Sequence, residues 1–340
     1  MATTTDGPET PAAGDRVPAA AARTGLGPLA STVRLWAVGL NTFREAVRDK
    51  VLYGVLAFAG ALLLFTLALA ELSLNERERI VHDIGLASIS LFAVVIAVFL
   101  GSSLLYKEID RKTLYIILPR PLRRHEFVVG KFVGIAVTAL VFIAIMGAIE
   151  LWVLAVLAQA PWPLLASVVV LAAGVLALAL VRARDRTAVL VPWSLALVLG
   201  GAGVAASAGV GLTPVLAALL LIFVEVLVVS AVALFFSAFS TPFLTGALTV
   251  GVWVVGRSAD EMADMRSELL TDAMKAFLRG VARVVPNFHL FVPGRHLLSG
   301  EADLSGGVGA YLLSTVGYGV AYAALLLIAA AIVFRRRDLL

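Results

Sequence analysis

The 340-residue sequence contains no cysteine. This absence excludes disulfide bonds, thiolate metal sites, thiol catalysis and palmitoylation. Charged residues are also scarce, because Asp, Glu, Lys and Arg make up 15% of the chain whereas apolar residues make up 61%. Soluble domains carry about 25% charged residues, so the composition excludes a soluble enzyme and a disordered chain. The mean hydropathy of +0.98 indicates a protein that folds in lipid.

The scarce charges leave several long segments without any Asp, Glu, Lys or Arg. Several of these segments exceed the roughly 20 residues that cross a bilayer core as a helix, whereas barrel strands would alternate polar and apolar residues over about ten positions. The sequence therefore predicts an all-α polytopic membrane protein. When these segments are divided at turn residues, they predict about eight spans, of which six are core helices and two are an extra pair. The spans are 51–70, 85–106, 132–157, 163–181, 187–209, 214–237, 242–256 and 307–334.

The first 50 residues divide into two parts. Residues 1–30 are rich in Ala, Thr, Pro and Gly and have few large apolar side chains, so they predict a disordered tail. Residues 31–50 predict an amphipathic helix in the membrane interface, and the alternative is a solvated extension of the first span. The apolar face of this helix comprises Trp36, Leu40, Phe43 and Val47, and the polar face comprises Arg34, Asn41, Glu45 and Arg48.

Basic residues predict the orientation of the membrane domain, which we place at residues 51–334. With the N-terminus inside, the inner segments carry 19 Lys and Arg residues and the outer segments carry 8. Because cytoplasmic loops are enriched in Lys and Arg, the N-terminus and the tail at 335–340 are predicted to be cytoplasmic. The formal net charge of +4 suits attraction to anionic lipid, and no nucleic-acid partner is expected.

The connection between the second and third spans, residues 107–131, is the most informative segment. Its 25 residues carry a net charge of +4 and exceed the length that a hairpin needs. Leu114, Ile117 and Leu118 recur at helical spacing before two prolines end the pattern. A short helix parallel to the membrane would offer a cytoplasmic partner a surface to push on. The alternative is an ordinary positive-inside loop.

Two stretches of this connection carry a longer pattern. They read Glu108-Ile-Asp-Arg-Lys-Thr113 and Pro121-Leu-Arg-Arg124-His-Glu-Phe127-Val-Val-Gly-Lys131. Together they resemble the ABC-2-type transporter permeases, whose segment reads approximately Glu-Ile, Thr-Leu, Leu and then Pro-Ile-Ser-Arg-x-Glu-Phe-x-x-Gly-Lys. Arg123 departs from a small polar residue, and Arg111-Lys112 departs from an Arg-Gly pair. These departures concern partner specificity.

Further segments resemble the same family over roughly residues 31–340. They are the entry helix with Phe43-Arg-Glu-Ala, a turn predicted to be cytoplasmic, a predicted outer segment, and the C-terminal tail. The last three read Leu234-Phe-Phe-Ser-Ala-Phe-Ser-Thr-Pro242, Val285-Pro-Asn-Phe288 and Phe334-Arg-Arg-Arg-Asp-Leu339.

The resemblance implies a permease without its own ATPase, in which two permease chains pair with two separate ATPase subunits that bind ATP and magnesium. A Walker A loop needs Gly-x-x-x-x-Gly-Lys and then Ser or Thr, but His125 and Phe132 occupy its first and last positions around Gly130-Lys131. We expect no cofactor, no metal and no enzymatic activity on this chain. The residues implied to couple to the ATPase are Glu108, Thr113, Leu114, Ile117, Pro121, Arg123, Arg124, Glu126, Phe127 and Lys131.

Glu150 and Glu225 are the two carboxylates inside the predicted spans. Charge inside a membrane is costly, so both are candidates for a transport role. Alternatively, Glu150 lies near the outer interface, or either residue is protonated or hydrogen-bonded across helices. We expect neither to have a basic partner within the spans. The sequence has no His-Glu-x-x-His or Gly-x-Ser-x-Gly, so protease and esterase chemistry lacks its groups.

Residues 257–303 form the largest soluble segment and are predicted to lie outside. In the resembled family this region caps the permease with helices that dip back toward the membrane, and the alternative is an interfacial loop. Apolar residues at helical spacing predict an amphipathic helix of roughly twenty residues. They are Met265, Leu269, Met274, Phe277, Leu278 and Val281.

The whole sequence predicts the permease subunit of an ATP-driven exporter in the plasma membrane. Its expected partners are an ABC ATPase subunit, a second permease chain and membrane lipid. Two other classes remain open. A secondary transporter driven by an ion gradient would carry paired intramembrane charges and an inverted repeat, and a membrane scaffold subunit would have no substrate path. Ions, lipids, peptides, polysaccharides and antibiotics all remain open as substrates.

Overall fold

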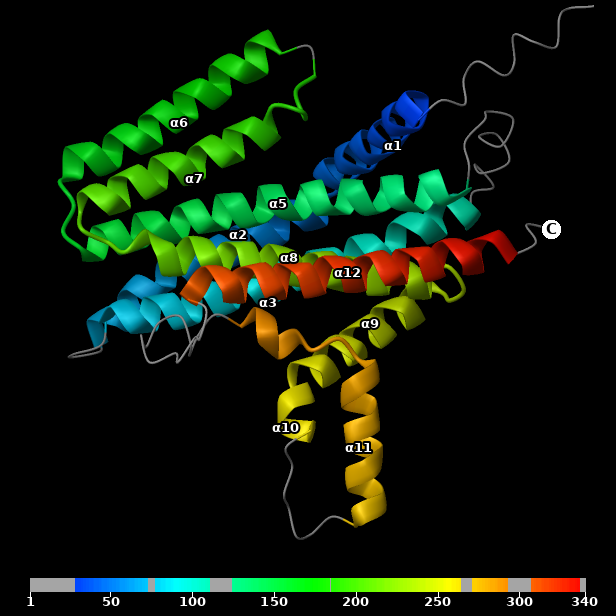
Figure 1. Cartoon of the computed structure of the whole chain (residues 1–340). Helices are drawn as coiled ribbons and strands as arrows, with labels where there is room; N and C mark the ends of the chain where they lie inside the picture. Colours follow the sequence, from blue (N-terminus) through cyan, green and yellow to red (C-terminus); the bar gives the residue numbers. More distant parts are fainter. Residues whose placement is uncertain are drawn as a thin grey trace, which may run out of the picture.

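The computed structural model describes residues 28–72, 77–110, 124–183, 185–263, 271–292 and 307–336. Regular secondary structure in these ranges is helical (Figure 1). The elements in chain order are α1 (Pro28–Arg48), α2 (Lys50–Leu72), α3 (Arg77–Asp110), α5 (Arg124–Leu157), α6 (Trp162–Arg182), α7 (Leu190–Ser207), α8 (Leu212–Ser237), α9 (Pro242–Arg257), α10 (Ala259–Ala263), α11 (Asp272–Val284), the 3-10 turn η1 (Phe288–Phe291) and α12 (Gly307–Arg336).

The long helices confirm the prediction of an all-α polytopic membrane protein. Among the described residues, seven helices are at least 18 residues long and apolar enough to cross a membrane. The remaining predicted span, 242–256, coincides with α9, which has 16 residues. At 1.5 Å per residue α9 is about 24 Å long, less than the roughly 30 Å of a hydrocarbon core. The eight predicted spans are therefore seven long helices and one short helix.

Helix α8 forms the centre of the bundle and packs against α3, α5 and α12. Its sequence is apolar on all sides, as expected for a helix surrounded by others. Small residues let α3 approach closely, because a Cβ at Gly101 would lie 2.5 Å from the Cβ of Ala233. Close backbone approach at small residues is typical of helix packing in membranes.

The predicted extra pair, α6 and α7, forms a hairpin beside α5. Helix α7 packs against α5 around Gly201, whereas α6 contacts chiefly α7 and lies outermost in Figure 1. The outer side of α6 exposes large apolar residues such as Val170 and Leu171. Such a surface would be unfavourable in water and suits contact with lipid.

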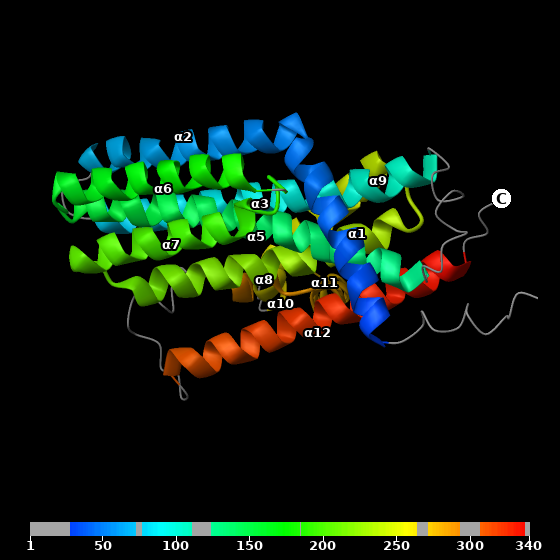
Figure 2. The same cartoon turned by 90° about the horizontal axis from the view of Figure 1, so that it is seen from above.

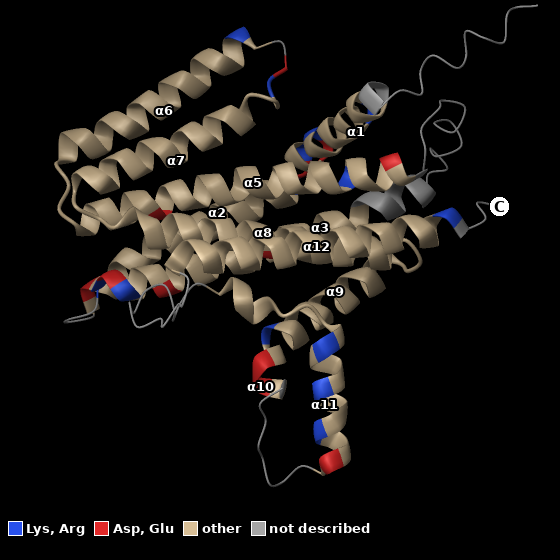
Figure 3. Cartoon of the chain, in the orientation of Figure 1, with Lys and Arg blue, Asp and Glu red and all other residues tan. Residues whose placement is uncertain are grey.

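The two described ends of the chain lie at the same end of the bundle. Helix α1 crosses the long helices at an angle and meets the start of α5, and the end of α12 lies beside them (Figure 2). Residues 111–123, which lie outside the described residues, connect α3 to α5 at this same end. Figure 3 shows charged residues gathered near the helix ends and on α10 and α11, while the middle of the bundle is mostly uncharged.

The predicted twenty-residue helix after α9 is wrong in length. The amphipathic helix is α11, with 13 residues, and α10 is a separate helix of 5 residues. Helix α11 begins at Asp272 because the Thr271 side chain caps it and accepts a hydrogen bond from the Met274 amide. Met265 and Leu269 lie outside the described residues. After α11 the chain returns to the bundle, where Phe288 and Phe291 of η1 are buried.

Candidate functional site

The predicted ATPase-coupling residues fall into three groups. Glu126, Phe127 and Lys131 lie near the start of α5 with described side chains. Glu108 lies in the last turn of α3 and Arg124 begins α5, within described backbone but without described side chains. The rest of the set lies outside the described residues: Thr113, Leu114, Ile117, Pro121 and Arg123.

Glu126 joins the start of α5 to α1. Its side chain is 1% exposed and accepts a hydrogen bond from Ser31 Oγ at 2.6 Å. Arg34 donates to both carboxylate oxygens, from Nη2 to Oε1 at 2.9 Å and from Nε to Oε2 at 3.1 Å. This hydrogen bond and the charge of Glu126 raise the pKa of the Arg34 guanidinium. A bidentate arginine–carboxylate pair fixes both distance and orientation, so α1 and α5 are held in one register.

The predicted faces of α1 therefore need correction. Arg34 was expected on the polar face, yet it contacts Glu126 of α5. Trp36 was expected on the apolar face, but it is 56% exposed, whereas Phe43 and Val47 are buried as that face requires. The difference arises because α1 meets α5 along a stripe that also contains Thr42, which is buried and donates its hydroxyl to the Val38 carbonyl.

Glycines of α5 make room for α1. A Cβ at Gly130 would lie 2.7 Å from the Cβ of Val38, and one at Gly134 would lie 2.4 Å from the Cβ of Thr42. Side chains at these positions would separate the helices. The Gly of the Gly-Lys motif thus has a packing role here, as in other small-xxx-small helix contacts.

A small aromatic cluster joins the same end of α5 to α12. The rings of Phe127 and Phe334 stack with centroids 6.3 Å apart, and Lys131 Nζ lies 5.5 Å from the Phe127 centroid. Ala238, just after α8, belongs to the same buried cluster, which partly buried Val38 of α1 also contacts. Segments singled out by the family resemblance are thus brought together at one end of the bundle. We call this set, comprising Arg34, Glu126, Phe127, Lys131, Ala238 and Phe334, the α5 junction.

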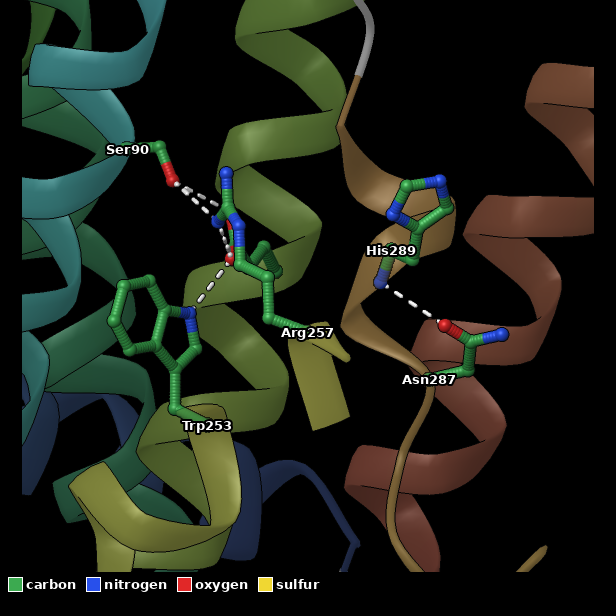
Figure 4. A network of polar contacts seen from close by, with 6 residues as sticks. Ser90, Trp253, Arg257, Asn287 and His289 are labelled. Carbon is green, nitrogen blue, oxygen red and sulfur yellow. Dashed lines mark hydrogen bonds and ion pairs between the residues drawn. The ribbon is translucent and has the colours of Figure 1, made fainter. Parts of the chain in front are cut away.

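Glu225 is the centre of a second polar site, drawn in Figure 4. Its carboxylate is 1% exposed. Ser90 Oγ of α3 donates to Oε2 at 2.8 Å, while Trp253 Nε1 and Arg257 Nη1 of α9 donate to Oε1, each at 2.8 Å. The Arg257 guanidinium also lies over the Trp253 ring, 5.3 Å from its centroid. The site therefore ties three helices together through one buried ion pair.

Glu225 was expected to have no basic partner within the spans, but it pairs with Arg257, one residue beyond the predicted span 242–256. Arg257 was assigned to the outer segment, but it is the last residue of α9 and returns beside the middle of α8. One sequence signal was available: Trp253 and Arg257 are four residues apart and so share a helix face. Pairing across 32 residues depends on how α9 packs, which periodicity does not reveal.

The segment after α11 is fastened to α12 by tyrosines. Tyr322 donates its hydroxyl to the Val284 carbonyl at 2.7 Å, Tyr311 donates to the Leu290 carbonyl at 2.6 Å, and Tyr318 accepts from the Asn287 amide at 3.0 Å. The Asn287 side chain donates to Asp260 of α10 at 2.6 Å and accepts from the His289 amide, a contact drawn in Figure 4. These bonds satisfy irregular backbone beside the bundle, as a membrane protein requires.

Glu150 lies apart from both sites. It is fully buried in α5, and neither carboxylate oxygen has a hydrogen-bond partner among the described residues. The side chain fits because its neighbour on α3 is Gly85, where a Cβ would lie 2.2 Å from Oε2. Within the described part of the chain, no ion pair joins a basic group to Glu150. An ionised carboxylate here would be costly.

Comparison with known families places these sites in context. A family model described as "ABC-2 family transporter protein" matches residues 36–339. The chain belongs to the ABC-2 transporter family. The match begins within α1 and includes the Glu225 site and every residue of the α5 junction except Arg34. No match was found among curated proteins.

Membership of the ABC-2 family gives the bundle a class of function. Members are membrane transport subunits that associate with an ABC ATPase. Together with the seven long apolar helices, this makes the chain a multi-pass membrane permease subunit of an ABC transporter. The resemblance inferred from residues 107–131 is confirmed at the level of the family.

Proposed function

We propose that the chain is the permease subunit of an ATP-driven exporter in the plasma membrane, coupled to a separate ATPase through residues 107–131. The observation that carries the proposal is the α5 junction. The junction lies at the start of α5, in the last part of residues 107–131. It joins α5 to α1 through the Arg34–Glu126 pair and to α12 through the Phe127–Phe334 contact. A force on the segment would therefore reach three helices at once.

The mechanical part of the proposal follows from the stiffness of the contacts. Helices move as rigid elements, and a bidentate ion pair between buried or half-buried partners resists sliding. When the ATPase subunit moves the segment, the start of α5 would carry α1 with it through Glu126. The stacked rings would pass the displacement to α12. Rearrangement of the spans would then open a path at a seam with a second permease chain.

ATP and magnesium belong to the partner subunit in this proposal. The chain supplies the surface and the charges that bind the ATPase, and its helices transmit the displacement. We further propose that both termini and residues 107–131 face the cytoplasm, because the inner segments carry 19 of the Lys and Arg residues against 8 outside. The α5 junction would then lie on the side where the ATPase resides.

One observation favours a second candidate function. A secondary transporter would carry paired charges within the membrane, and Glu225 and Arg257 form such a pair. The pair is fully hydrogen-bonded on the carboxylate side, which suits a structural tie better than a group that must release an ion. We therefore place the ATP-driven permease first.

The proposal is tested by co-expressing the permease with its cognate ATPase and recovering the complex through a permease tag. Ile117→Asp places an unpaired charge in the proposed contact and should reduce recovered ATPase by roughly thirtyfold, as expected for the loss of a buried anchor. Arg123→Ala, which removes a charge at the rim, should change recovery less. Membrane insertion of each variant serves as the control. Full recovery and normal stimulation of hydrolysis in Ile117→Asp would reduce residues 107–131 to a positive-inside loop.

A further inference from the structure

An apolar cavity of about 240 Å³ lies between α1, α2, α5 and α7. Its walls include Phe43 of α1, Leu56 of α2, Phe142 of α5 and Trp193 of α7. It is larger than engineered apolar cavities of about 150 Å³, which stay dry and bind small hydrocarbons. The walls therefore suit a hydrocarbon occupant.

Two polar side chains in the cavity walls, Thr138 and Trp193, are already engaged in hydrogen bonds. Thr138 donates its hydroxyl to the Gly134 carbonyl at 2.8 Å, and Trp193 Nε1 donates to the Ala172 carbonyl at 3.0 Å. Water needs two to four polar partners to occupy a cavity. With these groups engaged, the cavity favours a chain of methylene groups over water or a polar solute.

Basic residues lie close in sequence to the cavity-lining residues Val47, Leu52 and Leu190. Arg48 ends α1 and Lys50 begins α2, and both side chains are exposed. The turn between α6 and α7 adds exposed Arg186. The ion pair between Arg44 and Asp185 holds this turn beside α1, the helix that Arg48 ends.

We propose that the cavity binds one acyl chain of an anionic phospholipid, with its phosphate held by Arg48, Lys50 and Arg186. Anionic lipid supplies both parts at once, a hydrocarbon tail for the cavity and a negative headgroup for the basic mouth. The lipid would fill the space between the elbow and the α6–α7 hairpin and make the hairpin part of the bundle. This proposal does not depend on coupling to an ATPase.

The shape of the site favours a lipid over a second copy of the chain. Phe43, Thr138 and Phe142, which form the inner wall, are buried. A flat helix face from another protomer would cover the mouth without reaching this wall, whereas a single acyl chain is narrow enough to enter. Tyr53, at the cavity edge, is 55% exposed, as expected for an aromatic residue at a membrane interface.

The experiment is native mass spectrometry of the full-length protein released from nanodiscs that contain equal amounts of phosphatidylglycerol and phosphatidylcholine. The wild type should retain one phosphatidylglycerol. Leu56→Trp, which fills the cavity, should lose it, whereas Leu64→Trp, on an exposed part of the same helix, should keep it. Retention by Leu56→Trp equal to that of the wild type would overturn the proposal.

Charge variants test the mouth separately, and they remain informative if Leu56→Trp folds poorly. The double variant Arg48→Gln with Arg186→Gln should weaken the preference for phosphatidylglycerol by roughly tenfold or more. Arg279→Gln, an exposed basic residue of α11, is the matched control. An unchanged preference in the double variant would contradict the proposal. A change from dimer to monomer in Leu56→Trp without lipid loss would assign the cavity to an interface between copies.

Discussion

Glu225 shows how one residue can fix the position of a short helix. A buried carboxylate without partners would be strongly destabilising in a membrane. Here Ser90, Trp253 and Arg257 donate to it from two neighbouring helices. Since α9 is too short to be held by length alone, we expect this ion pair to determine where α9 ends against α3 and α8.

Removing the basic partner should therefore cost more than neutralising the acid. Arg257→Gln leaves a buried carboxylate unpaired and should destabilise the protein by about 2 kcal/mol, less than for a fully buried pair because Arg257 is partly exposed. Glu225→Gln preserves shape and should cost less, and the double variant should recover part of the loss. Thermal unfolding of the three variants measures this coupling. Zero coupling would show that the contact stabilises nothing.

Neutralising Glu150 and Glu225 separates the two candidate transport classes. In an ATP-driven permease, Glu150→Gln and Glu225→Gln should retain ATP-dependent transport, because neither residue carries the coupling ion. Loss of transport in both variants with assembly intact, together with a dependence on a proton gradient, would support a secondary transporter.

Gly85 is required by its neighbour Glu150. In Gly85→Ala the new Cβ would lie 2.2 Å from a Glu150 oxygen, and such overpacking costs about 2 kcal/mol. Gly174→Ala is the matched control, because a Cβ there has no neighbour within 4 Å and alanine favours a helix. The temperature of thermal unfolding should therefore be lowered only by Gly85→Ala. Equal stability of both variants would contradict the tight packing of α3 against α5.

At the scale of elements, long helices were predictable and their partners were not. Charge-free runs of membrane length have one stable solution in lipid, a helix, so seven spans followed from the sequence. The boundary between α10 and α11 was missed because the apolar period continued through residues without an obvious break. The sequence also identified Glu126 and Phe127 through a local motif. Their contacts with Arg34 and Phe334 could not be predicted, because they arise from packing between distant segments.

The contact between α1 and the α6–α7 turn has a defined pH dependence. Hydrogen bonds from Arg44 and Thr187 lower the pKa of the Asp185 carboxyl. Because the folded-state pKa lies below the unfolded value of about 3.9, the contact is fully present above that value and is lost as pH falls through the folded pKa. Spin-label distances between α1 and the turn should stay constant from neutral pH down to about pH 4 and then lengthen.

Asp185→Asn is the control for this titration. It should show a longer or broader distance at neutral pH and no acid transition. A wild-type distance that changes between pH 7 and pH 5 would point to another titrating group and contradict the assignment to Asp185.

At the scale of the whole molecule, the ABC-2 bundle differs between one of its ends and its side. One end gathers α1, the start of α5 and the end of α12 around the α5 junction, whereas α10 and α11 lie on another part of the molecule (Figure 1). In the orientation that we propose from the positive-inside rule, the first end faces the cytoplasm. The proposed ATPase contact requires this orientation, so topology and coupling are linked in one claim.

The most direct test of that claim is site-specific cross-linking to the ATPase, which the Cys-free sequence makes clean. Single-cysteine variants Ile117→Cys, in the proposed coupling segment, and Met274→Cys, on exposed α11, would be co-assembled with the cognate ATPase and treated with a short thiol-reactive cross-linker. We predict a permease–ATPase product from position 117 and none from position 274. A product from position 274, or an assembled complex without any product from position 117, would contradict the proposed orientation and coupling.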